Sequence, residues 1–183
     1  MKEEKKENRK IRITKMVLQD SLIELMKTKP ILSITIKDIC ELADMSRSTF
    51  YAHYHDQYDL LHQIQEEKLS YFEGLLTKYK DKQNKKEITE MVEEMFTYIA
   101  NNINSVQVLL SENGDIDFQK RIFRHFTNHK HVTKYFTDDQ KDNEAYYSVF
   151  VIHGCIGLVQ HWLKNNASMP VPQLAKMLIK WTG

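Results

Sequence analysis

The stretch TIKDICELADMSRSTFYAHYHDQYDLL, residues 35–61, decides the fold of this chain. Its first part predicts a short helix, because Thr35 can cap the free amides of a helix start and Asp38 lies near the positive end of the helix dipole. The pattern breaks at ADMS, and Ser46 can cap a second short helix, SRSTFYAHY. Two short helices joined by a tight turn, after a longer helix, predict a helix-turn-helix unit.

A longer helix and a basic segment precede this unit. Between Arg9 and Lys27 the apolar residues recur with helical period, and the helix must end before Pro30, because proline cannot join a helix interior. Residues 1–9 are expected to form a flexible basic arm. Positions 1–15 carry seven Lys or Arg and three Glu, whereas residues 55–183 hold 15 basic and 17 acidic residues. A basic tip on a nearly neutral body favours contact with a polyanion, and the alternative is a solvated tail that keeps the protein soluble.

The second short helix carries the side chains that a recognition helix needs. Short polar groups at its start can reach base edges and phosphates in a major groove without clashing. The residues that supply them are Ser46, Ser48 and Thr49. Arg47 can make paired hydrogen bonds to guanine or grip a phosphate, and the sequence leaves both open. Phe50 should point inward, and the outward positions further along are Tyr51 and His53.

Residues 10–62 resemble the N-terminal domain of the TetR family of bacterial transcription regulators. The pattern that carries the resemblance comprises Thr35, Ile39, Ala43, the run SRSTFY at 46–51, Tyr54, Leu60 and Leu61. Residues 154–178 show a looser likeness to the end of many family members. The resemblance implies DNA contacts from Thr35, Lys37, Arg47, Ser48, Thr49, Tyr51 and His53. The alternative is a polar surface helix of an ordinary helical bundle.

Two positions depart from the family pattern. Many members have Gly in the turn before the recognition helix, where Asp44 stands here. Asp tolerates the left-handed conformation better than most residues, so the turn should form at some energetic cost. Many members also carry a Lys at the start of the fourth helix, and Gln57 takes its place. Gln57 can still donate a hydrogen bond to a phosphate but brings no charge, which Lys10, Arg12 and the arm could offset.

Composition excludes several other classes of protein. Five Gly and three Pro in 183 residues are roughly a third of the average share, too few for turn-rich β folds or a Gly-rich nucleotide loop. No apolar run is long enough for a membrane helix or a signal peptide, so a cytoplasmic protein is expected. Cys40 and Cys155 are predicted to be reduced. No HExxH, GxSxG or CxxC motif occurs, so the sequence predicts neither an enzyme nor a cofactor.

The rest of the chain, 57–183, predicts a helical effector-binding and dimerisation domain behind a DNA-binding domain at 10–56. Helices are expected at 57–79, 87–101, 103–111, 115–128, 143–164 and 172–181, which makes an all-α protein of about nine helices. Residues 143–164 form the most apolar segment, and Gly154 and Gly157 would let another helix approach closely. The family resemblance implies a homodimer through the last two helices. Two recognition helices related by a twofold axis would read a palindromic operator.

Aromatic side chains of this second domain suggest a pocket for an apolar or aromatic effector that releases a repressor from its operator. The candidate lining residues are Phe96, Tyr98, Phe118, Phe126, Tyr147, Phe150 and His153. An alternative is a metal sensor, because His125, His129 and His131 cluster, with His153 and His161 further along. Control by a protein partner, with no effector pocket, is a second alternative.

Overall fold

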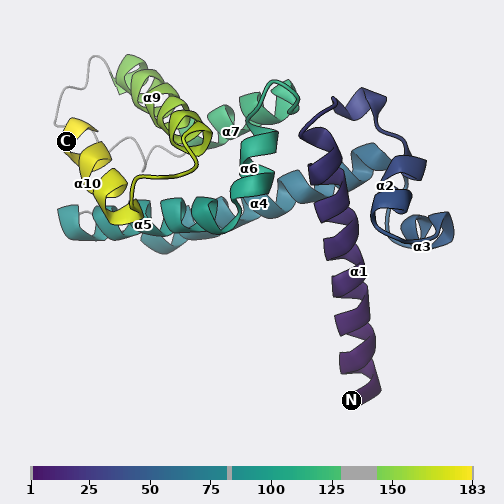
Figure 1. Ribbon diagram of the computed structural model, residues 1–183. Coiled ribbons are helices and arrows are strands. Elements are labelled where there is room, and N and C mark those ends of the chain that lie inside the picture. Colours follow the sequence, from purple (N-terminus) through teal and green to yellow (C-terminus); the bar gives the residue numbers. More distant parts are fainter. Residues whose placement is uncertain (1, 82–83, 129–143, 183) are drawn as a thin grey trace.

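The computed structural model describes residues 2–81, 84–128 and 144–182 (Figure 1). These ranges contain nine α-helices, one short 3-10 helix and no strand, which confirms the predicted all-α fold. None of the helices in these ranges is long and apolar enough to cross a membrane.

The N-terminal part of the chain forms a compact head of short helices on one long one. The head consists of α1 (Lys2–Met26), η1 (Ile31–Ser33), α2 (Ile36–Leu42) and α3 (Arg47–Tyr51). Its core comprises side chains from all three α-helices and from the start of the fourth. The central residues are Leu18, Leu22, Met26, Ile39, Phe50, Tyr54 and Leu60.

The first helix is longer than predicted. Residues 2–9, expected to form a flexible arm, instead continue α1 back to Lys2, so that α1 projects away from the head (Figure 1). The segment KEEKKENRK contains no Gly or Pro, and Lys, Glu and Arg are good helix formers. The basic residues of this segment therefore lie along a helix.

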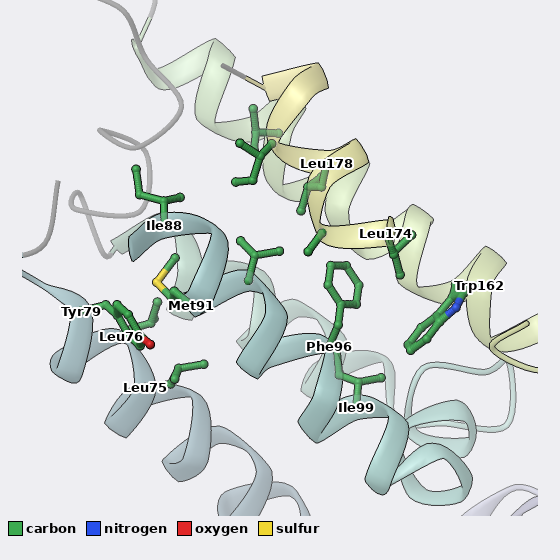
Figure 2. Close-up of a cluster of buried hydrophobic side chains, with 14 of the residues drawn as sticks. Leu75, Leu76, Tyr79, Ile88, Met91, Phe96, Ile99, Trp162, Leu174 and Leu178 are labelled. Atoms are coloured by element: carbon green, nitrogen blue, oxygen red, sulfur yellow. The ribbon is translucent and has the colours of Figure 1, made fainter. Parts of the chain in front are cut away.

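The second part of the chain is a helical body. It consists of α4 (Gln57–Tyr79), α5 (Lys85–Asn101), α6 (Ile103–Leu109), α7 (Ile116–Asn128), α9 (Glu144–Lys164) and α10 (Val171–Thr182). In Figure 1, α4 runs from the head on the right to the body on the left. Figure 2 shows α5 between two neighbours, with Leu75 and Leu76 of α4 on one side and Leu174 and Leu178 of α10 on the other.

Head and body share one of the two hydrophobic clusters. Val108 and Leu109 of α6 and Phe118 of α7 are buried with the residues of the head core. Polar contacts accompany this packing: Gln65 of α4 donates a hydrogen bond to Asp115 at 3.1 Å, and Arg121 of α7 pairs with Glu66 of α4. The head is thus supported by α6 and α7 as well as by α4.

Candidate nucleic-acid interface

The start of α2 is fixed by a reciprocal cap. The Asp38 amide donates to the Thr35 hydroxyl at 3.2 Å, and the Thr35 amide donates to the Asp38 carboxylate at 2.9 Å. The hydrogen bond from the Thr35 amide is the largest of the effects that lower the pKa of Asp38. Thr35 itself is exposed, so its hydroxyl lies at the surface where α2 begins.

The turn between α2 and α3 places Asp44 in the left-handed conformation, with φ of 50°. Its amide donates to the Glu41 carbonyl and the next amide, of Met45, donates to the Cys40 carbonyl at 2.9 Å. This is the Schellman arrangement, in which Gly is the usual residue at the left-handed position. The sequence prediction that Asp44 occupies this position is confirmed.

Hydroxyl groups gather at the start of α3. Ser46 caps the helix by accepting a hydrogen bond from the Thr49 amide at 3.1 Å. Its hydroxyl also lies 2.7 Å from that of Ser48 and 2.9 Å from that of Thr49. Arg47 and Ser48 are exposed, and Thr49 is half-buried.

Two neighbouring aromatic residues of α3 lie on opposite sides of the helix. Phe50 packs into the core of the head, and Tyr51 faces outward. Phe50 is 0% exposed and packs against the Tyr54 ring, with 5.7 Å between centroids. Burial of Tyr54 raises the pKa of its phenol to about 12. Tyr51 is 58% exposed on the other side of the same helix. Arg47, Ser48 and Tyr51 therefore lie at the surface of a helix whose position is set by buried residues.

The remaining sequence-predicted contacts flank this surface. Lys37 is exposed on α2 and pairs with Glu41 at 3.5 Å. His53 follows α3 and is half-buried, with its ring edge-on to Tyr54. Gln57 is half-buried at the first position of α4, where Asp56 caps the helix.

A second feature is a cavity of about 140 Å³ in the body, lined by side chains of α4, α5, α6, α7, α9 and α10. Three of the seven aromatic and histidine candidates line it, namely Phe96, Phe118 and Phe126. Within the described part of the chain its surface is apolar, and Lys68 of α4 lines it only through the aliphatic part of its side chain. Lys68 was not among the predicted lining residues. The i, i+4 spacing of Ile64, Lys68 and Phe72 nevertheless places Lys68 on the buried stripe of α4.

The other four candidates do not line the cavity. Tyr98 instead stacks on Tyr71, with 3.6 Å between ring centroids, and Tyr147 packs at the edge of the body core. Phe150 is 73% exposed. His153 is also exposed, with Nδ1 2.9 Å from the Val149 carbonyl and its ring against Phe123. Helical periodicity identified the apolar residues of α9 but not which of them face the cavity.

The histidines proposed as metal ligands are not brought together in the described residues. His129 and His131 lie outside those residues, and His125 is on α7. Nε2 of His161 lies 3.2 Å from the amide nitrogen of Asn165. No group of three or more His, Cys, Asp or Glu side chains suited to a metal ion occurs where the structure describes the chain.

Comparisons with known proteins agree with this architecture. Residues 86–182, more than half of the chain, match the TetR_C_8 family, described as a transcriptional regulator C-terminal region. No curated protein matches the sequence.

Several solved structures share the fold. A TetR transcriptional regulator from Streptococcus agalactiae 2603V is 23% identical, with a TM-score of 0.68 over 96% of this chain and 97% of that one. The regulator FadR from Bacillus subtilis, in complex with stearoyl-CoA, is 14% identical, with a TM-score of 0.69 over 91% and 96%. A TerR/AcrR-family regulator from Aquifex aeolicus VF5 is 18% identical, with a TM-score of 0.63 over 92% and 96%. The chain therefore belongs to the TetR family of transcriptional regulators.

Proposed function

We propose that this chain is a homodimeric, sequence-specific DNA-binding repressor that a small-molecule effector releases from a palindromic operator. The observation that carries the proposal is the surface of α3. Its cap at Ser46 and its buried anchor Phe50 hold Arg47, Ser48 and Tyr51 together at the surface. A short, rigidly held helix with exposed polar side chains at its N-terminal end suits the major groove.

Charged and polar groups around α3 would fix its position on the duplex. Thr35 and Lys37 at the start of α2 would contact phosphates, as would Gln57 at the start of α4. Thr49 and His53, which are half-buried, would contribute at the edge of the contact. Lys10 and Arg12, which are exposed on α1, would add to the phosphate contacts, so affinity should fall steeply with salt.

The dimer interface is proposed to form on α9 and α10. An apolar surface of α9 is open to water, and its exposed large side chains are Tyr146, Val149 and Phe150. Among the described residues, no atom lies within 4 Å of a Cβ added at Gly154 or Gly157, so a partner helix could approach this face closely. Trp181 adds an exposed aromatic ring on α10. Covering these side chains in a second copy would remove apolar surface from water.

The cavity is proposed as the effector site because two of its wall residues also support the head. Leu109 and Phe118 line the cavity and are buried in the cluster that contains the head core. A molecule that shifted α6 or α7 would therefore act on the packing of the head. The shift can be no larger than the effector's differential affinity for the two dimer states. A neighbour of the same fold, FadR from Bacillus subtilis, was solved with stearoyl-CoA, which supports a small-molecule role.

The Arg47→Ala variant tests the assigned role of α3. A bidentate contact to guanine contributes about 1–3 kcal/mol, so affinity for a selected duplex should fall roughly 5- to 150-fold for each lost contact. The measurement is fluorescence anisotropy at fixed salt, with Arg124→Ala on α7 as the matched control. An Arg47→Lys variant separates the two roles left open, because Lys keeps the charge but loses the paired geometry. Equal affinity of Arg47→Ala and the wild type would remove α3 from the interface.

A further inference from the structure

The cavity in the body has an apolar surface within the described residues. Its walls are mostly the side chains of Phe, Leu, Ile, Val and Met residues from six helices. Helical hydrogen bonds occupy the backbone amides and carbonyls of these helices, so the side chains decide which groups a ligand meets. Two lining residues, Lys68 and Cys155, end in a titratable group, and each has to be considered as a partner for a polar ligand.

The ammonium of Lys68 is bound by groups that do not line the cavity. Its Nζ donates a hydrogen bond to the side-chain oxygen of Asn102 at 2.6 Å and lies 5.5 Å from the centroid of the Tyr98 ring. Neither Asn102 nor Tyr98 is a lining residue. Lys68 therefore contributes its aliphatic stem to the wall, as a long basic side chain does when its charged end is held elsewhere.

The thiol of Cys155 is neutral in this environment. Burial raises the pKa of Cys155 to about 11, so the thiol is protonated near pH 7. A thiol is a weak hydrogen-bond donor and a weak acceptor, and a buried Cys behaves as a small apolar residue. The described lining thus offers a ligand neither a charge nor a strong hydrogen-bonding group.

Such a lining disfavours polar ligands. A polar molecule that entered the cavity would give up its hydrogen bonds to water and gain no strong ones in return. Burying a hydroxyl or amide without a partner raises the free energy of the complex, and burying a charge raises it far more. A hydrocarbon has no such bonds to lose and gains by leaving water. The cavity should therefore prefer a hydrocarbon to any polar analogue of the same shape.

The size of the cavity limits the ligand further. Its volume of about 140 Å³ is close to that of an engineered apolar cavity of about 150 Å³ in another protein, which binds benzene. Met91 and Met95 are among the lining residues, and their flexible thioether side chains can adjust to the shape of an occupant. One small ring fills such a space.

We propose that the cavity binds an uncharged hydrocarbon of about the size of benzene that carries no hydrogen-bonding group. The proposal names the chemical class of the effector and so rests on the proposed function. Carboxylic acids, amines and alcohols of the same size are excluded by the same lining that accepts the hydrocarbon.

The test is a calorimetric titration of the full chain with toluene and with two polar analogues, benzyl alcohol and benzoate. Toluene should bind about tenfold or more tightly than benzyl alcohol, because the alcohol loses its hydrogen bonds to water. Benzoate should give no measurable heat of binding, because its charge would be buried without a partner.

A filled cavity should lose the ligand. Ile122 lines the cavity from α7 and is half-buried, so a larger ring at this position takes up part of the space. Ile122→Trp should lower toluene affinity by about tenfold or more. The matched control is Ile116→Trp on the same helix, at a position that is 66% exposed, and it should bind toluene as the wild type does.

An enlarged cavity guards against a folding defect in Ile122→Trp, because misfolding does not create a specific site. Phe126 is a half-buried wall residue, and Phe126→Ala adds the space of one ring. This variant should bind naphthalene, which has two fused rings and should not bind to the wild type.

Three results would overturn the proposal: no binding of toluene, a polar analogue that binds as tightly as toluene, or unchanged toluene affinity in Ile122→Trp. The titration contains no DNA, so its failure leaves the role of α3 untouched. If toluene binds as expected but does not release the protein from its operator, the effector role fails while the ligand class stands.

Discussion

The Phe50→Ala variant is expected to lower the free energy of unfolding by about 3–5 kcal/mol, the usual loss when a buried Phe is truncated. Phe50 is fully buried in the core of the head, beside the Tyr54 ring, and it is the buried residue of the five-residue helix α3. Removing it leaves a cavity that neighbouring side chains fill only in part. Operator binding should fall as well, because α3 would no longer be held in one position.

The matched control for this variant is the next residue. Tyr51→Ala also removes an aromatic ring from α3, but this ring is largely exposed, so the expected change in stability is within about 0.5 kcal/mol. Urea unfolding followed by circular dichroism measures both variants. If Phe50→Ala and Tyr51→Ala were equally stable, Phe50 would not be the anchor of α3.

The Phe150→Glu variant is expected to convert the proposed dimer to a monomer. Phe150 is 73% exposed in one chain, and it lies on the α9 surface proposed to pack against a second copy. Burying two carboxylates in that contact without partners costs far more than the contact gains from its apolar area. Operator affinity should then drop by about 100-fold or more, because the second half-site no longer binds as part of the same molecule.

The control is the same substitution at another exposed apolar residue, one that lies in the head. Leu32 is 80% exposed on η1, so Leu32→Glu introduces the same charge away from α9 and should leave the dimer intact. Sedimentation velocity gives the oligomeric state of each variant. A Phe150→Glu protein that remains dimeric would place the interface on a different surface.

The fold was largely predictable because its helices carry their own start and stop signals. Thr35, Ser46 and Asp56 each cap a helix in the structure, and Asp44 ends α2 in the left-handed conformation that its position suggested. The start of α1 was not predictable from apolar periodicity, because residues 2–9 have no apolar stripe. Their helix propensity was the signal that could have placed them in α1.

The site was predictable only where neighbouring residues in sequence determine it. The exposed positions of α3 follow from its period and from the inward Phe50. The cavity depends on how six helices pack, and periodicity could not say whether Phe150 or Val151 faced it. Phe150 is exposed, and Val151 lines the cavity. Lys68 was not predicted to line the cavity, because a charged residue on an apolar stripe interrupts the hydrophobic pattern, although its aliphatic stem contributes to the lining.

Selection of bound DNA from a random pool tests the central claim most directly. Two copies of α3 related by a twofold axis predict an enriched palindrome, with half-sites centred about 34–36 Å apart on one face of the duplex. The Arg47→Ala variant should enrich this sequence far less strongly than the wild type does. A pool with no enriched sequence, or a sequence that the wild type and Arg47→Ala enrich equally, would contradict a sequence-specific role for α3.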